Sequence, residues 1–395
     1  MLEAVVAVYG DWGIGAGGTQ PVVVSADRKH FREITGGSAV LVGRKTLADF
    51  PGGKPLKNRT NIVLTRQELD IPGAVVVHSE AEALAECQAY DRVFVIGGAS
   101  VYHAFIPHIH RVHVTKIDCV PHSDAFFPNL DIDPDWEVES EGPGQTDENG
   151  VSYRFMTYVR RLSPELQAAL DWMNDTDPLT RMGGIFPILR RSARLLSRSD
   201  RGLTFYDDFS HISYAFGEVD TLPEGFGQGS RVFITDSAES AAMIAAQFGL
   251  GDVHDYDQVC YLHDAPPAGG IGNSLRIARP TDAEMARINA DYDLAEMPEL
   301  QRDRARGDLF AAHDAQEHFV GYMGIHADGS MGLLKVFPEY RRLGYAEEFE
   351  RFIMATVLSR GYQPFAQIAP DNTASMHLQL KLGCVKAPGR IWFLW

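Results

Sequence analysis

The sequence is poor in cysteine, and no long apolar run interrupts it. Its four cysteines, Cys87, Cys119, Cys260 and Cys384, lie far apart in 395 residues and show no CxxC spacing. We interpret them as free buried thiols in a reducing compartment. No segment is long and apolar enough to span a bilayer, and the N-terminus lacks a secretory pattern, so we expect a cytoplasmic protein with no membrane partner.

Basic residues are also scarce: 36 lysines and arginines face 53 aspartates and glutamates, for a formal net charge of −17. This balance excludes a nucleic-acid backbone as partner, because nothing would offset phosphate repulsion. Small phosphorylated cofactors stay allowed, since they need only a local group of cations and N–H donors. With 45% hydrophobic and 23% charged residues, the composition is that of a globular protein, and the length predicts two or three domains.

The residues Val93–Phe105 predict an anion-binding junction. The apolar run Val93–Ile96 is typical of a strand buried on both faces. Gly97 and Gly98 follow where the chain must turn, and a helix is expected to begin at Ala99. Free N–H groups at a helix start attract anions, so the junction predicts a diphosphate site, with a tight structural turn as the alternative.

Two further strand–helix junctions carry cations. The expected strand Ser38–Val42 leads into Gly43-Arg-Lys-Thr46, and the expected strand Asn61–Thr65 ends at Arg66. Basic side chains at the same ends of neighbouring parallel strands converge on one anion. These junctions therefore strengthen the prediction of a phosphorylated ligand.

A helix is expected to open near Ser25, upstream of both junctions. Ser25 is suited to cap it, and Asp27 lies in its first turn, where the helix dipole favours a carboxylate. Taken alone, Asp27 is interpreted as no more than a first-turn residue.

The order and spacing of these pieces resemble dihydrofolate reductase from about Leu2 to Arg161. The matching segments are Trp12-Gly-Ile-Gly, Ala26-Asp27…Phe31, Gly43-Arg-Lys-Thr, Pro55-Leu56…Arg59-Thr-Asn-Ile-Val-Leu-Thr-Arg66, Ile96-Gly-Gly…Val101-Tyr102, Thr115-Lys-Ile and Asp124-Ala-Phe-Phe-Pro128. The resemblance implies an α/β fold class, with a mixed, mainly parallel sheet flanked by helices in a domain of residues 1–161.

The resemblance also implies that NADPH lies across these strand ends. Its 2′-phosphate would meet Arg44 and Arg66, and its diphosphate would meet Thr46 and the glycine turn, whose Gly97–Gly98 bond is expected to be cis. The implied cofactor contacts are Ile14, Gly15, Gly43, Arg44, Lys45, Thr46, Leu64, Thr65, Arg66, Gly97, Gly98, Ala99, Ser100 and Val101.

For the substrate, dihydrofolate, the resemblance assigns the catalytic carboxylate to Asp27, held from behind by Thr115. Asp27 would accept hydrogen bonds from the pteridine, and Arg59 would bind the glutamate carboxylate. The other implied substrate contacts are Val5, Ala7, Phe31, Phe50, Leu56, Ile96 and Tyr102. The implied reaction is hydride transfer from NADPH to C6 with protonation of N5, which yields tetrahydrofolate for one-carbon metabolism.

One departure from the family lies in the loop before Asp27. The family usually has Pro-Trp there, whereas this chain has Gln20-Pro21-Val22-Val23-Val24. The indole that anchors a water near the pteridine is missing, so we expect a slower reductase.

Four histidines, His103, His108, His110 and His113, raise the alternative of a metal site. No cysteine or clustered carboxylate accompanies them in the sequence. We interpret them as solvated histidines and expect no metal.

Residues 165–395 carry a second resemblance, clearest from Leu275. Phe337-Pro-Glu-Tyr-Arg-Arg-Leu-Gly-Tyr-Ala346 follows an expected strand and opens a helix, which predicts a second diphosphate cradle. This run and the downstream Asn372–Gly383 resemble the acetyl-CoA loop and next helix of GNAT-type acetyltransferases. The implied acetyl-CoA contacts are Val336, Arg341, Arg342, Leu343, Gly344, Tyr345, Ala346 and Asn372. We expect a GNAT-like α/β domain at 271–395 and interpret the α/β region 165–270 as a degenerate first half of a tandem.

The GNAT-like part departs from its family at Gln379, where many relatives have a tyrosine that protonates the leaving thiolate. An amide cannot act as an acid. Glu339, His326, Tyr345 and His377 are alternative acids among which the sequence does not choose. The domain is therefore either an acetyltransferase with a different acid or a module that binds acyl-CoA without turnover.

Two alternatives to the favoured fusion stay open. An NADPH reductase of the riboflavin-pathway type shares the first fold, although Asp27 and Arg59 favour folate. In a different class, one half acts only as a cofactor-binding or scaffolding module. The sequence leaves the amine acceptor and the oligomeric state open.

Overall fold

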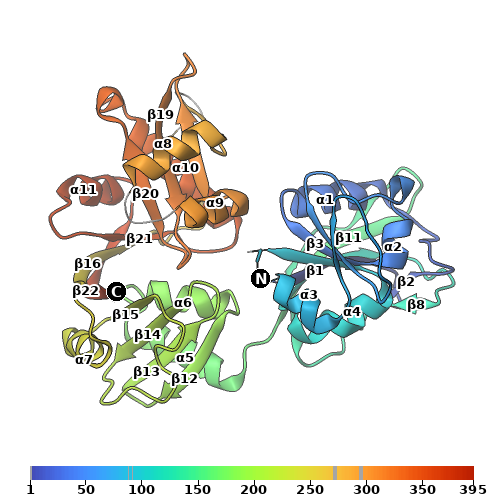
Figure 1. The fold of residues 1–395 in the computed structure, drawn as a ribbon, viewed down its shortest axis with the longest axis horizontal. Helices are drawn as coiled ribbons and strands as arrows, with labels where there is room; N and C mark the ends of the chain where they lie inside the picture. The colour runs from blue at the N-terminus through green and yellow to red at the C-terminus, as the bar shows by residue number, and fades with distance from the viewer. Residues whose placement is uncertain (1, 88, 91, 270–273, 293–296) are drawn as a thin grey trace. The chain divides into compact units, whose positions relative to one another are not determined.

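The computed structural model describes residues 2–87, 89–90, 92–269, 274–292 and 297–395. The chain divides into two units, Met1–Arg161 and Leu162–Trp395, each described by itself below (Figure 1). No described helix combines the length and apolar character that a membrane crossing requires.

The unit Met1–Arg161 is built on a mixed sheet. Its strands are β1 (Leu2–Val8), β2 (Gly13–Gly15), β3 (Ala39–Gly43), β4 (Thr60–Leu64), β5 (Ala74–Val77), β6 (Val93–Gly97), β7 (Arg111–Ile117), β8 (Ala125–Phe126), β9 (Trp136–Glu141), β10 (Gln145–Thr146) and β11 (Ser152–Arg160). Its helices are α1 (Ser25–Thr35), α2 (Arg44–Ala48), α3 (Glu80–Cys87) and α4 (Ala99–Phe105). The main sheet has the order β10-β11-β7-β1-β6-β3-β4-β5, with β9 also paired to β11, while β2 and β8 pair separately.

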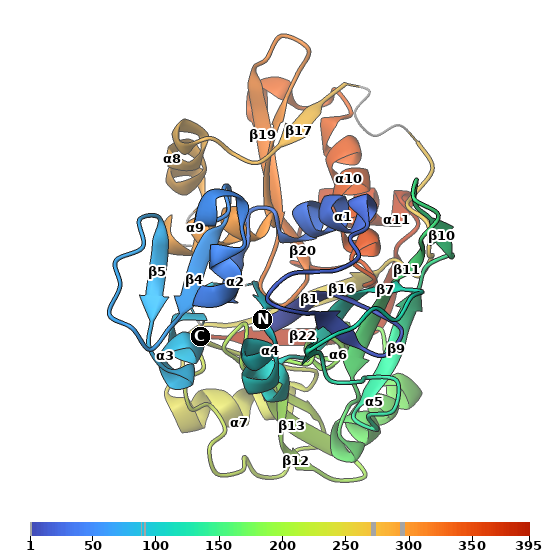
Figure 2. The ribbon, with the colours of Figure 1, turned by 90° about the vertical axis from the view of Figure 1, so that its right-hand side faces the viewer.

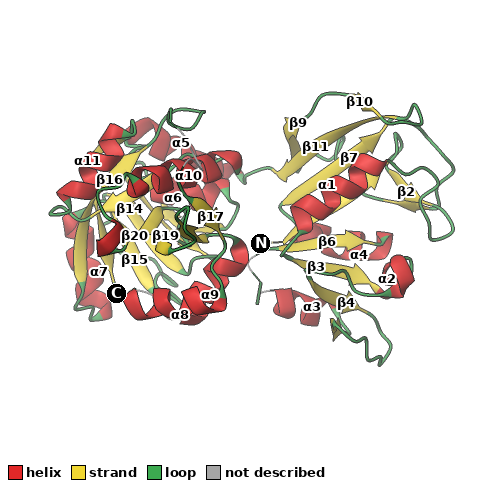
Figure 3. Cartoon of the chain, turned by 90° about the horizontal axis from the view of Figure 1, so that it is seen from above, coloured by secondary structure: helices red, strands yellow, loops and turns green. Residues whose placement is uncertain are grey.

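The strands from β7 to β5 in this order are parallel, and β11 runs antiparallel to β7. The parallel strands are rich in valine, leucine and isoleucine because apolar cores cover both faces of the sheet. Alternate residues of β1 serve different cores: Val6 belongs to the larger core with α4, and Val5 faces the smaller core with Phe31 of α1. Helix α1 lies along β7 and β11 on the Val5 face (Figure 3).

The unit Leu162–Trp395 contains two sheets. Its strands are β12 (Ala193–Arg198), β13 (Gly202–Asp207), β14 (Ile212–Gly217), β15 (Val232–Thr235), β16 (Val253–Cys260), β17 (Arg276–Ala278), β18 (Leu309–His313), β19 (Phe319–Ile325), β20 (Met331–Val336), β21 (Phe365–Ile368) and β22 (Val385–Leu394). Its helices are α5 (Pro164–Thr176), α6 (Met182–Leu189), α7 (Ala238–Phe248), α8 (Asp282–Asp291), α9 (Met297–Arg306), α10 (Tyr345–Ser359) and α11 (Thr373–Lys381). One sheet has the order β12-β13-β14-β15-β22-β16-β21 and the other β17-β18-β19-β20, against which α10 packs (Figure 2).

The order of elements in this unit repeats. From α5 to β16 the order is two helices, four strands, one helix and one strand. The same order recurs from α8 to β22, apart from one inserted helix. The second run inserts α10 between β20 and β21, whereas the described residues 218–231 at the equivalent place of the first run form turns. The predicted boundary at residues 270 and 271 lies outside the described residues. The two runs share a sheet, because the last strand, β22, pairs with both β15 and β16.

Candidate functional site

The start of α1 places Asp27 over the sheet of the first unit. The expectation that Ser25 caps this helix is wrong: Val24 occupies the N-cap position, and Ser25 is already the first helical residue. Asp27 therefore lies in the first turn, and its carboxylate hydrogen-bonds to the hydroxyl of Thr115 on β7. Ala7 of β1 is the register partner of Thr115, so the three residues come together as expected.

The environment of Asp27 changes its acidity. Burial raises the pKa of the carboxyl, while the hydrogen bond from Thr115 and the charges of His30 and Arg28 act in the opposite direction without cancelling the rise. A partly desolvated carboxylate of this kind binds N–H donors more strongly than an exposed one does. The arrangement suits a ligand that carries paired N–H groups.

Apolar side chains surround this carboxyl-bearing face. Val5 and Ile96 are buried, and Phe31, Phe50 and Leu56 pack half-buried against the same cluster, as the sequence predicts. Their exposed parts offer flat apolar walls. Tyr102 differs, because its ring belongs to the core on the other face of the sheet and only its hydroxyl reaches across, donating to the Val5 carbonyl at 2.6 Å.

Arg59 is fixed at the C-terminal end of α1. Its Nε donates to Thr35 Oγ1 at 2.8 Å, and its terminal nitrogens donate to the carbonyls of Arg32 at 3.1 Å and Lys57 at 2.9 Å. The guanidinium also lies 5.7 Å from the centre of the Phe31 ring. It is thus a positioned cation at the edge of the apolar walls.

Asn61 is a positioning residue that the sequence analysis missed. Its amide binds Leu56 twice, accepting from the backbone N–H and donating to the carbonyl at 2.9 Å each, and it also donates to the Arg59 carbonyl at 3.1 Å. Asn61 is buried inside the strand TNIVL. A polar residue in such an apolar run was the available signal.

In the second part of the site, the ends of β3, β4 and β6 lie close together. Gly43 of β3 is in register with Leu64 of β4, and Val42 with Gly97 of β6. The Gly97–Gly98 peptide bond is cis, as predicted. A Cβ atom at Gly98 would lie 2.9 Å from Thr46 Oγ1, and one at Gly43 would lie 3.0 Å from Val101 Cγ2, so a side chain at either position would crowd its neighbour.

Around these strand ends stand the residues predicted to contact a cofactor. Arg44, Lys45 and Thr46 form the first turn of α2, and Ala99, Ser100 and Val101 form that of α4. Leu64 ends β4, and Thr65 and Arg66 follow it directly. Three cations and two helix starts therefore share one edge of the sheet. This edge suits an anion with several phosphate groups.

The loop before α1 lacks an indole but has a defined anchor. The Tyr9 hydroxyl donates to the Val22 carbonyl at 2.9 Å and accepts from the Val22 N–H at 3.0 Å. The side chain of Val22 packs beside Val24 in the same apolar cluster. Ile14 and Gly15 lie on β2 across the loop, and Ile14 packs against the larger core.

The interpretation of all four histidines as solvated is wrong for His113. Its side chain is 14% exposed, because β7 lies inside the sheet between β1 and β11. Its Nε2 lies 2.7 Å from Glu3 Oε2, and Arg92 binds both oxygens of Glu3 at 2.7 and 2.9 Å. No group of three or more potential metal ligands occurs among the described residues.

In the second unit, the loop before α10 forms an exposed helix start. Gly344 is its N-cap with φ of 84°, Arg342 has φ of 64°, and Arg341 Nε donates to the Val336 carbonyl at 3.1 Å. Leu343 is exposed, and Tyr345 and Ala346 begin the helix. Asn372 caps α11, accepting from the Ser375 N–H at 3.1 Å.

Strand β20, which leads to this loop, contains a bulge. Tyr322 of β19 is in register with Lys335, but Gly324 is in register with Gly332, so two residues of β20 face one of β19. Leu333 in the bulge has φ of 54°. Bulges are frequent beside active sites because they turn backbone groups out of the ladder.

Gln379 is buried rather than open to a cleft. Its side-chain oxygen accepts from Cys384 Sγ at 3.3 Å, and its amide hydrogen-bonds to Glu350 of α10. Burial raises the pKa of Glu350 to about 7, an acid that the sequence analysis missed.

The four alternative acids lie elsewhere in the second unit. Glu339 pairs with Arg287 at 3.5 Å, and His326 is held through its backbone, whose N–H donates to the Ser330 carbonyl at 2.8 Å. Tyr345 packs on the core at the start of α10, and His377 is two positions from Gln379 on α11, which puts it on another side of that helix.

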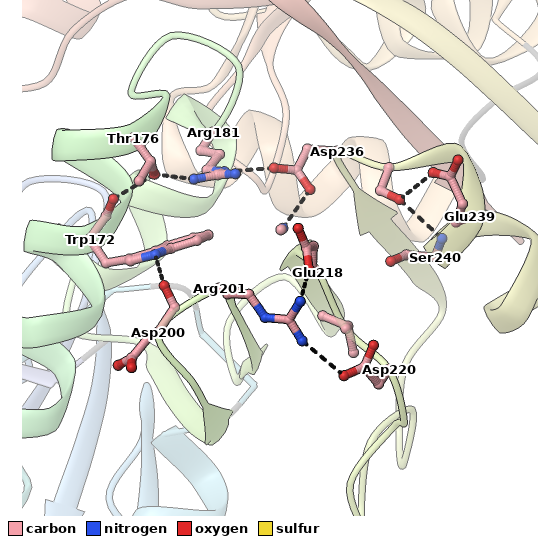
Figure 4. A pocket seen from close by; sticks show the side chains of 13 residues that line it. Trp172, Thr176, Arg181, Asp200, Arg201, Glu218, Asp220, Asp236, Glu239 and Ser240 are labelled. Carbon is pink, nitrogen blue, oxygen red and sulfur yellow. Dashed lines mark hydrogen bonds and ion pairs between the residues drawn. The ribbon is translucent and has the colours of Figure 1, made fainter.

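A cavity of about 580 Å³ lies in the first run of the second unit (Figure 4). Arg181 stacks on Trp172 at 4.1 Å and binds Asp236 at 2.6 Å, and Asp236 also accepts the Gly217 N–H at 2.8 Å. Five carboxylates line the cavity against two guanidinium groups: Asp200, Glu218, Asp220, Asp236 and Glu239 against Arg181 and Arg201. Excess negative charge disfavours a diphosphate here, in contrast to the loop before α10.

Two family models match the chain: "Dihydrofolate reductase" at residues 1–160 and "FR47-like protein" at residues 312–393. The dihydrofolate reductase of Bacillus subtilis (strain 168) is 33% identical over 165 residues, 41% of this chain and 96% of the relative. That of Mycobacterium tuberculosis (strain ATCC 25618 / H37Rv) is 38% identical over 152 residues, 37% of this chain and 90% of the relative.

A solved structure is also similar: the dihydrofolate reductase from Enterococcus faecalis complexed with NADP(H) and RAB-propyl. It is 35% identical, with a TM-score of 0.38, and the match covers 41% of this chain and 96% of that one. Residues 312–393 form a GNAT-type, FR47-like domain. Through residues 1–160, the chain belongs to the dihydrofolate reductase family.

Proposed function

We propose that residues 1–161 reduce 7,8-dihydrofolate to tetrahydrofolate with NADPH. The observation that carries the proposal is the half-buried Asp27 carboxylate, hydrogen-bonded to Thr115 beside apolar walls. The carboxylate accepts the ring N–H and amino N–H donors of the pteridine. Bound NADPH would supply the hydride for C6, and a proton from water reaches N5 in a site whose charge is set by Asp27.

Other residues of the chain position the substrate. Phe31, Phe50 and Leu56 exclude water from the faces of the pteridine and its neighbouring ring. Arg59 is held by three hydrogen bonds at the end of α1 and keeps N–H donors for the carboxylate of the glutamate tail.

The direct test is NADPH consumption by the purified full-length chain, followed by the loss of its reduced-nicotinamide absorbance. We expect consumption when dihydrofolate is added and none with a ribosylamino-pyrimidine of the riboflavin pathway. The opposite preference would overturn the folate assignment while keeping the reductase.

Cofactor choice gives a further prediction. In the double variant Arg44→Gln/Arg66→Gln, we expect KM for NADPH to rise roughly tenfold or more, because charge-assisted bonds to the 2′-phosphate each contribute about 1.5–3 kcal/mol. KM for NADH, which lacks that phosphate, should change by about twofold at most. Lys29→Gln, which removes an exposed charge on α1, is the matched control. Equal losses with both cofactors would contradict the assignment.

For the second unit, we infer an acetyl-CoA-dependent N-acyltransferase whose amine acceptor stays open. The match to FR47-like proteins, the exposed helix start at Arg341–Ala346 and the bulge in β20 support it. The repeated order of elements, with turns and an acidic cavity in the first run, supports a tandem whose first half is degenerate.

Gly344 offers a test of this second site. Both Gly344 and Gly361 have positive φ, 84° and 81°, and a Cβ atom at either would meet open space. Valine costs similar backbone strain at each, roughly 1–2 kcal/mol. We expect Gly344→Val to weaken acetyl-CoA binding about tenfold or more in calorimetry, and Gly361→Val to bind as the wild type does. Equal affinities for the two variants would count against the loop.

A further inference from the structure

His30 is an ionisable residue of the reductase site that the proposed mechanism does not use. It follows Asp27 by three positions on α1, so the two side chains share a face of the helix. Its ring lies 4.3 Å from the ring of Phe155 on β11, centre to centre. Phe155 is the register partner of Thr115, whose hydroxyl binds Asp27. His30 therefore lies beside the strand pair that holds the Asp27 carboxyl.

A second histidine faces the same space from β7. His113 is two residues before Thr115 and hence on the same face of that strand. Its Nε2 is bound to Glu3 at 2.7 Å, and Glu3 is clamped on its other side by Arg92. These contacts fix the His113 ring on the face of β7 that also carries Thr115.

The ionisable groups around His30 act on it in opposite directions. Asp27 and Glu33, both on α1, favour its protonated form, whereas burial and His113 of β7 disfavour it, and the pKa of His30 is lowered overall. From β11 the packed neighbour is the uncharged ring of Phe155. Interactions between two titrating groups are reciprocal, so a proton on His30 also favours the ionised form of Asp27.

We propose that His30 is a positioning residue of the reductase: as an imidazolium it keeps Asp27 ionised when the surroundings become acidic. The two residues then titrate as a coupled pair. The fall in the rate of dihydrofolate reduction at acid pH is therefore set by the protonation of both residues rather than of Asp27 alone. The catalytic consequence rests on the proposed function, whereas the coupling itself is a property of the folded chain.

The coupling is tested by NMR titration of the histidine ring protons in the full-length protein, without substrate. We expect the pKa of His30 to fall in Asp27→Asn, because the favourable carboxylate is gone. The exposed His103 on α4 is the internal control and should titrate alike in both proteins. A His30 titration that is unchanged in Asp27→Asn would overturn the proposal, whether or not the chain reduces folate.

The consequence for catalysis is tested by the pH profile of NADPH oxidation with dihydrofolate. We expect His30→Gln to lose activity at higher pH than the wild type, so that its rate on the acid limb of the profile falls roughly threefold further, while rates at pH 8 stay similar. His103→Gln is the matched control. Superimposable profiles of His30→Gln and the wild type would reject a role in catalysis. If the wild type consumed no NADPH, the proposed function would fail and the NMR titration alone would decide the coupling.

Discussion

Asp27→Asn is expected to lower kcat/KM for dihydrofolate by about 10²–10⁴ near neutral pH, the range typical for loss of an acid–base group. Asparagine keeps the size of the side chain but presents an N–H group where the pteridine offers N–H donors, and it removes the charge that biases N5 protonation. NADPH affinity should stay within about twofold, because the cofactor contacts are at the strand ends of β3, β4 and β6. Steady-state rates and NADPH titration measure the two effects.

The matched control is Asp70→Asn, which removes an exposed carboxylate from the loop before β5. A second readout separates function from folding. Burial raises the pKa of Asp27, so its ionised form costs stability at neutral pH. Asp27→Asn should therefore unfold at an equal or higher temperature than the wild type. Full activity in Asp27→Asn, with intact folding, would refute the role of the carboxylate.

Glu3→Gln is expected to destabilise the unit Met1–Arg161 by about 3 kcal/mol at pH 7, within the range for breaking a buried ion pair. Glu3 is 2% exposed and binds Arg92 and His113. We choose the lower end of that range because the Arg92 side chain is 39% exposed and keeps contact with water. Urea unfolding, monitored by a spectroscopic signal from this unit, measures the change in its free energy of unfolding.

The pH dependence of this effect has a definite sign. Burial alone would raise the pKa of Glu3. The charge of Arg92 and the hydrogen bonds of His113 and Arg92 outweigh this effect and hold the pKa well below its ordinary value. The stabilisation is present above the unfolded-state pKa and is lost as pH falls through the folded-state value. The difference in the free energy of unfolding between the wild type and Glu3→Gln should therefore decrease at acid pH.

The matched control is Glu139→Gln, which breaks the more exposed ion pair with Arg111. This variant should lower the free energy of unfolding by less than about 1 kcal/mol. Equal costs for the two variants would show that burial does not matter here.

Local sequence pattern was enough to predict the elements that build the reductase site. The runs that form β1, β3, β4 and β6 are mainly apolar, and the glycines stand where three strand ends approach closely. These features depend on residues that are close in sequence, so they can be recognised from the sequence alone.

The polar residues behind the site could not be predicted in the same way. Glu3 meets Arg92 and His113 across 89 and 110 positions, and no local pattern records such a pairing. His113 looked solvated because the covering strand, β11, follows it by some forty residues of sequence and pairs antiparallel. Glu350 was missed for the same reason: its partner Gln379 comes from another helix.

The position of β22 has a consequence for how the protein is made. The first unit has all the described strands of its sheet once Arg161 has emerged from the ribosome, because each of those strands lies before Leu162. The larger sheet of the second unit needs β22 before it can close, since β22 fills the place between β15 and β16. Until β22 has emerged from the ribosome, β15 and β16 present bare edges that invite association with other chains. A nascent chain stopped before Val385 therefore carries a finished first unit joined to an unfinished second unit.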